Sequence, residues 1–295
     1  MSTCLALDIG GTKIAVAIVQ KGRVEERTQI QTPSSQQPTQ LAESLQRLIF
    51  SWKDKADYVA VASTGIIDGG ELVALNPANL GGLNHFPLRS TIEELSGKPT
   101  AVINDAQAAA WAEYQSISQP VSEMAFITVS TGVGGGLIVN GELVIGKHGI
   151  AGHIGHTLAD PNGPLCGCGR KGCLESIASG RAIAAAGQEH FGDKCTGKTV
   201  FEHFEHGDLQ AKKIVSLSAQ ALANTVANLK ISFDVQVVVL GGSIGLAPGY
   251  LPLVQSFLSK MPDAYQVKLT HALNGADAGL IGVASWAARQ LNNDV

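Results

Sequence analysis

The sequence has no excess of basic residues. Its 295 residues include 21 lysines and arginines against 25 aspartates and glutamates, which gives a formal net charge of −4 at pH 7. A protein that binds along the phosphates of a nucleic acid, or on an anionic membrane surface, needs a basic face. The charge balance therefore argues against both kinds of partner.

Long hydrophobic runs, runs of like charge, low-complexity tracts and internal repeats are missing as well. The first segment, Met1–Leu7, has no basic start, and its apolar run is interrupted at Asp8. It therefore resembles neither a signal peptide nor a membrane-spanning segment. Hydrophobic residues still make up 45% of the chain, enough for a sizeable core, so we expect a globular protein.

Cysteine is scarce, with five residues, but Cys166, Cys168 and Cys173 lie close together. In a chain without a secretory signal, such clustering indicates metal or redox chemistry rather than a disulfide framework, and it predicts a cytoplasmic location. Together with His156 the three cysteines make a closed Cys₃His set, which is typical of structural zinc. His153 is an alternative fourth ligand. A redox Cys-x-Cys pair is an alternative use of the cysteines, but it leaves the third one unexplained.

The order of predicted elements repeats once along the chain, because each half opens with an apolar strand, a glycine turn and a second strand. We therefore expect an α/β fold of two lobes with a cleft between them, where polar ligands commonly bind. The predicted N-terminal lobe is residues 1–110, with the C-terminal helix 277–295 packed back on it, and the C-terminal lobe is residues 111–276. The predicted strands are 5–8, 14–20, 23–31, 58–63, 100–104, 125–131, 136–145 (two strands and a turn) and 235–240, and the predicted helices are 38–52, 106–114, 210–230 and 277–291.

The first glycine turn follows an apolar strand and begins with an acidic residue. Glycine lets backbone N–H groups approach a phosphate closely, a threonine hydroxyl can donate to a phosphate oxygen, and an aspartate can hold Mg²⁺ through water. An ordinary hairpin turn would give the same pattern, and the spacing of a Walker loop is absent. The candidate nucleotide-binding residues here are Asp8, Gly10, Gly11, Thr12 and Lys13.

A second glycine turn follows the strand that opens the second half. A flexible connection is the alternative to a phosphate loop, but two such turns together favour two loops that grip the phosphates of one nucleotide. Gly242, after the buried strand 235–240, is a candidate for packing against an adenine ring or simply a turn residue. The candidate residues in the second turn are Thr131, Gly132, Val133, Gly134 and Gly135.

Asn104 and Asp105 stand where a predicted strand ends and an alanine-rich helix begins. A carboxylate at that point is held by rigid elements and could accept the proton of an attacking hydroxyl group. Asp105 could equally serve only to cap the helix that starts at Ala106. The residues alone leave both roles open.

These motifs together resemble the ROK family (repressors, open reading frames and kinases) of the actin-like ATPase superfamily, over essentially the whole chain. The cysteine signature is specific to that family, whereas the glycine turns are shared by many actin-like kinases. The segments that carry the resemblance are 8–13, 63–67, 76–80, 104–110, 130–136, 155–175 and 241–243.

The resemblance implies two ribonuclease-H-like lobes that close on a sugar and ATP, with Mg²⁺ accompanying the nucleotide, a structural Zn²⁺, and a homodimer as the common assembly. It implies that Asp105 is the catalytic base acting on the 6-hydroxyl of the sugar, and that His156 lies beside the sugar as well as on the zinc. The residues that match sugar-binding positions are Gly65, Asn79, Asn104 and Glu175.

One departure from the family pattern bears on the substrate. Many ROK kinases read Glu-x-Gly-His where this chain reads His153-Ile154-Gly155-His156, so an imidazole replaces a carboxylate beside the sugar. This argues against a glucokinase-like specificity. The resemblance implies N-acetylmannosamine as the sugar, with a glucokinase or N-acetylglucosamine kinase as the alternatives. The alternatives that are not kinases are a ROK repressor and a non-catalytic sugar sensor. A repressor would carry a helix-turn-helix ahead of the sugar domain, and a sensor would be expected to lose Asp105 or the glycine loops.

Overall fold

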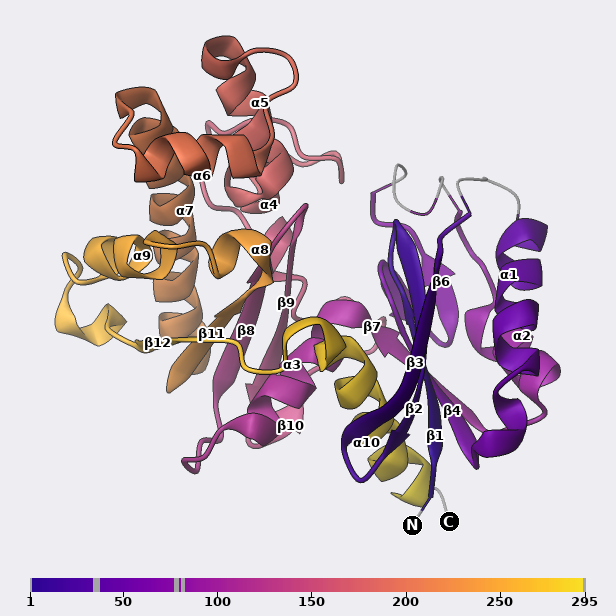
Figure 1. The fold of residues 1–295 in the computed structure, drawn as a ribbon. Helices are drawn as coiled ribbons and strands as arrows, with labels where there is room; N and C mark the ends of the chain where they lie inside the picture. The colour runs from indigo at the N-terminus through magenta and orange to yellow at the C-terminus, as the bar shows by residue number, and fades with distance from the viewer. Residues whose placement is uncertain (1, 34–37, 77–79, 81–82, 294–295) are drawn as a thin grey trace. The chain divides into compact units, whose positions relative to one another are not determined.

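The computed structural model describes residues 2–33, 38–76, 80 and 83–293. The chain divides into two compact units, each built on a five-stranded sheet (Figure 1). The first unit comprises Met1–Ser116, Leu143–Gly152 and Ala276–Val295, and the second comprises Ile117–Glu142 and His153–Gly275.

The sheet of the first unit has the strand order β3-β2-β1-β4-β7. Strands β1, β2 and β3 pair antiparallel, and β4 and β7 continue the sheet parallel to β1. The parallel strands are apolar and buried, as expected for strands covered on both faces. Their bounds are Cys4–Ile9 (β1), Lys13–Gln20 (β2), Arg23–Gln31 (β3), Tyr58–Ser63 (β4) and Thr100–Asn104 (β7).

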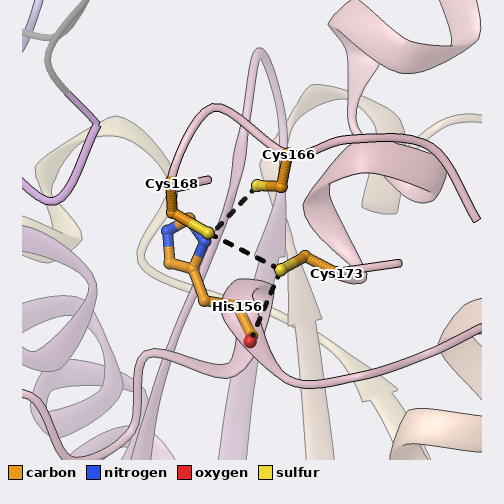
Figure 2. Close-up of side chains that lie close together, drawn as sticks. All are labelled: His156, Cys166, Cys168 and Cys173. Carbon is orange, nitrogen blue, oxygen red and sulfur yellow. Dashed lines mark hydrogen bonds between the residues drawn. The ribbon is translucent and has the colours of Figure 1, made fainter. Parts of the chain in front are cut away.

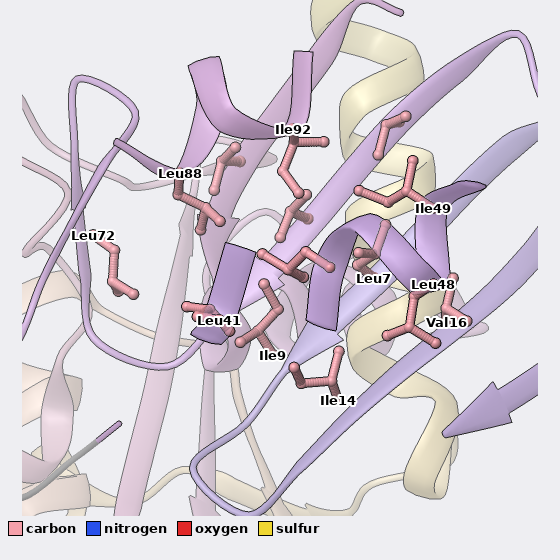
Figure 3. Packing of buried hydrophobic residues seen from close by; sticks show 14 of the residues in the cluster. Leu7, Ile9, Ile14, Val16, Leu41, Leu48, Ile49, Leu72, Leu88 and Ile92 are labelled. Atoms are coloured by element: carbon pink, nitrogen blue, oxygen red, sulfur yellow. The ribbon is translucent and has the colours of Figure 1, made fainter. Parts of the chain in front are cut away.

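The two faces of this sheet differ in side-chain size, because alternate residues of a strand point to opposite faces. In β1, the large residues Leu5, Leu7 and Ile9 join one core cluster, whereas Cys4 and Ala6 join another. Figure 3 shows Leu7 and Ile9 within the first cluster. The face with the large side chains packs against α1 (Pro38–Phe50) and α2 (Leu88–Ser96). The small face carries several alanines and packs against α3 (Asp105–Ser116) and α10 (Ala278–Asn293).

The sheet of the second unit repeats the plan, with the order β10-β9-β8-β11-β12. The strands are Met124–Val129 (β8), Val133–Val139 (β9), Glu142–Leu143 (β10), Val237–Gly241 (β11) and Lys268–His271 (β12). The helices are Glu175–Ala178 (α4), Gly180–Phe191 (α5), Gly197–Glu205 (α6), Leu209–Phe233 (α7), Gly242–Gly245 (α8) and Tyr250–Leu258 (α9).

The predicted α/β fold with two ribonuclease-H-like lobes is confirmed, since both sheets have three antiparallel strands followed by two parallel ones. One boundary is corrected: β9 begins at Val133 rather than Gly136. Residues Gly134, Gly135 and Gly136 already pair with β8, opposite Thr128, Ile127 and Phe126. Elements not predicted include α2, α4 to α6, α8, α9, β12, the hairpin of β5 (Ile66–Asp68) and β6 (Glu71–Val73), and 3₁₀ turns at Lys53–Lys55 (η1), Ile154–His156 (η3), Asp263–Tyr265 (η4) and Gly275–Asp277 (η5).

Among the described helices, none has both the length and the apolar character required to cross a lipid bilayer.

Candidate functional site

Asn104, the last residue of β7, caps helix α3. Its side-chain oxygen accepts the backbone N–H groups of Ala106 (2.9 Å) and Gln107 (3.1 Å), which would otherwise lack partners at the start of a helix. Its side-chain amide donates to the carbonyl oxygens of Gly65 (2.9 Å) and Ser63 (3.4 Å). Asn104 is only 5% exposed, so its amide is engaged in holding the start of α3 against the end of β4.

Gln107 completes this cap and was not singled out from the sequence. Its side-chain oxygen accepts the N–H of Asn104 (3.4 Å), the reciprocal half of a capping box. Its side-chain amide donates to the carbonyl oxygens of Gly149 (3.2 Å) and Ala151 (2.8 Å), so it also fixes segment 149–151 on α3. The spacing of an asparagine followed three residues later by glutamine was the signal that could have identified it.

Asp105 lies in the first turn of α3 and is half-buried. Burial raises the pKa of its carboxyl group, and hydrogen bonds from the N–H of Ala106 (2.8 Å) and from Asn104 oppose the rise. Because Asn104 provides the helix cap, Asp105 is not needed for that purpose. A carboxyl group whose pKa is raised is a stronger base than an ordinary carboxylate, which suits it to accept a proton.

Asp8 is a second carboxyl group in the same unit, on the small-residue face of β1. A Cβ atom added at Gly279, in the first turn of α10, would lie 2.8 Å from an Asp8 carboxylate oxygen, so the helix approaches Asp8 closely. Burial and then the charge of Asp105 raise the pKa of Asp8 to about 7, while Arg27 opposes the rise. Arg27 is itself held by Asp277, with 3.3 Å between Nη1 and Oδ1.

The first glycine turn is the exposed connection between β1 and β2. The N–H of Gly10 donates to the carbonyl oxygen of Lys13 (2.9 Å), and its carbonyl oxygen accepts the hydroxyl of Thr32 (2.7 Å). Gly11 and Thr12 are exposed. Among the described residues, none apart from the chain neighbours of Gly11 has an atom within 4 Å of the position of a Cβ there. The turn is therefore fixed at its base and open at its tip.

The second glycine turn is more tightly packed. Gly134 and Gly135 lie within β9, and a Cβ at Gly135 would meet Ile154 at 2.7 Å and the carbonyl oxygen of Phe126 at 2.8 Å. Gly242, with φ +85°, would place a Cβ 2.3 Å from the carbonyl oxygen of Val129. At Gly135 and Gly242, packing within the unit is by itself enough to require glycine.

Glu175 contacts this second turn directly. One carboxylate oxygen accepts the N–H of Val133 (3.0 Å) and lies 2.5 Å from where a Cβ of Gly132 would be. The other lies 3.8 Å from the guanidinium of Arg181, a residue that sequence reasoning did not assign. The Glu175 carboxylate, which was predicted to bind a sugar, thus contacts the glycine turn that was predicted to bind phosphate.

Gly65 lies between β4 and β5 and has φ +93°, a conformation that favours glycine. A Cβ there would lie 2.9 Å from Leu72. Asn79, the other predicted sugar-binding residue of this region, lies outside the described residues.

His156, Cys166, Cys168 and Cys173 converge at one point (Figure 2). One donor atom from each lies within 4.8 Å of all the others, with 3.6 Å between Cys166 Sγ and His156 Nδ1 and 3.7 Å between Cys168 Sγ and Cys173 Sγ. Four donors placed about 2.1–2.3 Å from a tetrahedral zinc ion would be separated by roughly 3.5–3.8 Å. The donor set therefore fits a zinc ion in both chemistry and spacing.

Of the two histidines considered as fourth ligand, the structure gathers His156 and not His153 with the three cysteines. His153 precedes η3, the short turn that contains His156. Burial and the neighbouring sulfurs of Cys168 and Cys166 raise the pKa of Cys173 to about 12. A bound cation is what would allow so crowded a set of sulfurs to ionise together.

A family profile described as the ROK family matches residues 4–290. The chain belongs to the ROK family. Its relatives within the family include proteins named N-acetylmannosamine kinase from Haemophilus influenzae (strain PittGG) and Escherichia coli (strain SMS-3-5 / SECEC). The first is 55% identical over 96% of this chain and 94% of its own length, and the second is 54% identical over 97% and 98%.

Solved structures of other ROK proteins resemble this one closely. A ROK hexokinase from Thermus thermophilus has a TM-score of 0.87 and 32% identity, covering 99% of each chain. A ROK glucokinase from Streptomyces griseus, solved with glucose and AMPPNP, has a TM-score of 0.80 and 28% identity, covering 97% of this chain and 99% of its own. A ROK transcriptional regulator matches with a TM-score of 0.81 at 22% identity, so within this family the fold alone does not separate kinases from regulators.

Proposed function

We propose that this protein is an ATP-dependent kinase that phosphorylates the 6-hydroxyl group of N-acetylmannosamine. The observation that carries the proposal is Asp105, a half-buried carboxyl group of raised pKa in the first turn of α3, a helix that Asn104 caps. The choice of sugar is supported by relatives named N-acetylmannosamine kinase at 53–55% identity over at least 94% of their length.

In the proposed reaction, Asp105 accepts the proton of the sugar 6-hydroxyl while that oxygen attacks the γ-phosphorus of ATP. A new oxygen–phosphorus bond forms, the bond between the γ-phosphorus and the bridging oxygen breaks, and ADP leaves. Most of the catalysis in such a transfer comes from positioning and charge stabilisation rather than from covalent steps. The Asn104 and Gln107 cap supplies the positioning at Asp105.

Asp8 would hold the Mg²⁺ that accompanies ATP, through water. Its pKa near 7, raised by burial and by the charge of Asp105, indicates a place where a cation would relieve the crowding of negative charge. When bound, Mg²⁺ neutralises charge on the phosphates. The glycine turns at 10–12 and 131–133, with Lys13, are the proposed contacts to those phosphates.

The proposed sugar contacts are Gly65, Asn79, His153, His156 and Glu175, with Asn104 positioning Asp105. A zinc ion in the Cys₃His set would have no open coordination position, so its proposed role is to fix the segment that carries His156 rather than to act on the substrate. A homodimer and a role in sialic acid catabolism are further parts of the proposal.

The direct test is a coupled assay of ADP release with N-acetylmannosamine, N-acetylglucosamine, glucose and mannose. We expect the highest kcat/KM with N-acetylmannosamine. A preference for glucose or N-acetylglucosamine would instead identify the protein as a glucokinase or an N-acetylglucosamine kinase. ATP turnover that no sugar stimulates would favour a sensor or regulator instead.

A further inference from the structure

The turn between β8 and β9 already holds an anion in this structure, and the anion is the side chain of Glu175. Its carboxylate accepts the N–H of Val133 at 3.0 Å and occupies the space that a side chain at Gly132 would fill. The Glu175 side chain is 14% exposed. A mostly buried carboxylate bound to a backbone N–H of a glycine turn shows that the turn binds anionic oxygen.

Arg181 provides the positive charge at the same place. Its backbone N–H donates to the carbonyl oxygen of Thr131 (3.2 Å), and Gly180 donates to Ser130 (2.7 Å), so the start of α5 is attached to the turn. The Arg181 guanidinium lies 3.8 Å from the position of a Gly132 Cβ and 3.8 Å from a Glu175 oxygen. Because its side chain is 51% exposed, it can reach a ligand in solution.

A carboxylate and a phosphate are recognised by the same groups, backbone N–H donors and a guanidinium fork. A nucleotide phosphate carries more charge than a carboxylate, so it is the stronger ligand for such a pair. A separation of 3.8 Å between Arg181 and Glu175 is longer than a charge-assisted hydrogen bond, so this contact is a loose one that a better-placed anion can replace.

We propose that Arg181 binds a phosphate group of the nucleotide, and that Glu175 occupies this anion position until the nucleotide arrives. The inference rests on the proposed kinase function and extends it to a residue outside the glycine turns. Nucleotide binding then displaces the carboxylate of Glu175 from Val133. Glu175 becomes available to the sugar hydroxyls only after that displacement.

The test measures binding of AMP-PNP with Mg²⁺ by calorimetry, in the absence of sugar, to the full-length protein and three variants. Arg181→Gln is expected to weaken binding about 10-fold or more, the loss of one charge-assisted contact. Arg181→Lys, which keeps the charge and loses the fork, is expected to weaken binding about 3-fold. Glu175→Gln is expected to tighten binding about 3-fold, because the internal competitor loses its charge.

The matched control is Lys198→Gln, which removes one positive charge from an 86% exposed side chain on α6. It is expected to bind AMP-PNP as the unaltered protein does. Melting temperature and zinc content are measured on every variant, so that damage to the fold is separated from loss of a phosphate contact. If Arg181→Gln does not fold, Arg181→Lys decides the question.

Unchanged AMP-PNP affinity in both Arg181 variants would overturn the role of Arg181. Weaker binding by Glu175→Gln would overturn its role as an internal competitor. Failure of the proposed function is distinguishable, because a protein that binds AMP-PNP with this pattern but phosphorylates no sugar contradicts the kinase assignment alone. An unaltered protein that binds no AMP-PNP contradicts both.

Discussion

The charge of Asp105, at the start of α3, acts on the carboxyl group of Asp8, at the end of β1. Burial of Asp8 is the largest cause of the rise in its pKa, and repulsion from Asp105 is the second. Together they raise the Asp8 pKa from 3.8 to about 7, although the positive charge of Arg27 opposes the rise. The fold thus places two acidic groups within electrostatic range of each other, an arrangement typical of a binding site for cations.

This relationship predicts how stability depends on pH. The folded chain binds the Asp8 proton more tightly than the unfolded chain, so the contribution of Asp8 to the free energy of unfolding is greatest below about pH 4 and declines as the pH rises to about 7. Asp8→Asn removes the ionised form. In Mg²⁺-free buffer we expect it to increase the free energy of unfolding at pH 8 by at least about 1 kcal/mol, and by less at pH 5.

Urea denaturation of both proteins at the two pH values measures this difference. Asp54→Asn, which alters an exposed carboxyl group of the same unit, is the control and should change stability little at either pH. An equal effect of Asp8→Asn at pH 5 and pH 8 would show that the Asp8 pKa is not raised.

Asp105→Asn is expected to lower kcat by about 10²–10⁴-fold, the usual contribution of a general base. The amide keeps the size of the side chain and cannot accept the proton, so sugar affinity measured by calorimetry should stay within a few-fold of the original. Substantial residual turnover would remove Asp105 from the role of base.

Cys168→Ser is expected to reduce bound zinc well below one ion per chain, because one of four donors is lost. The melting temperature should fall, and the KM for sugar should rise, since His156 lies in the same donor set. Cys195→Ser is the control, because Cys195 is buried outside the set. Metal analysis and thermal denaturation provide the measurements, and a metal-free variant with full activity would contradict a structural zinc.

His153→Glu restores the carboxylate that many ROK kinases carry two residues before the sequence Gly155-His156. The negative charge accepts hydrogen bonds from sugar hydroxyls, which neutral imidazole does less well. We expect the ratio of kcat/KM for N-acetylmannosamine to that for glucose to fall about 10-fold. An unaltered ratio across the four sugars would show that His153 does not determine specificity.

Asn104→Asp keeps the oxygen that caps α3 but removes the two N–H donors to Gly65 and Ser63. It also places a carboxylate 2.9–3.4 Å from two carbonyl oxygens in a buried position. We expect the free energy of unfolding to fall by about 2–4 kcal/mol. Asn228→Asp, on the exposed side of α7, is the control for the change of charge, and an equal effect of both would contradict the structural role of Asn104.

Much of the scaffold was predictable from local patterns. Residues of alternating size predict β1, and an apolar run predicts β11. Both predictions are possible because the sequence pattern of a strand is complete within a few residues. The short helices α4 to α6 were not predicted. They are stabilised by packing against α7 and one another more than by their own periodicity.

The sequence by itself determined the ROK family, the two-sheet plan and the candidate ligands, because these follow from motifs and periodicities that neighbouring residues carry together. Only the tertiary structure decided that Asn104 rather than Asp105 caps α3, that His156 rather than His153 joins the three cysteines, and that Glu175 lies on the second glycine turn. Each of these depends on contacts between residues distant in the chain, such as Asn104 with Gly65 and Glu175 with Val133. Such contacts arise from the packing of whole elements, which no local pattern records.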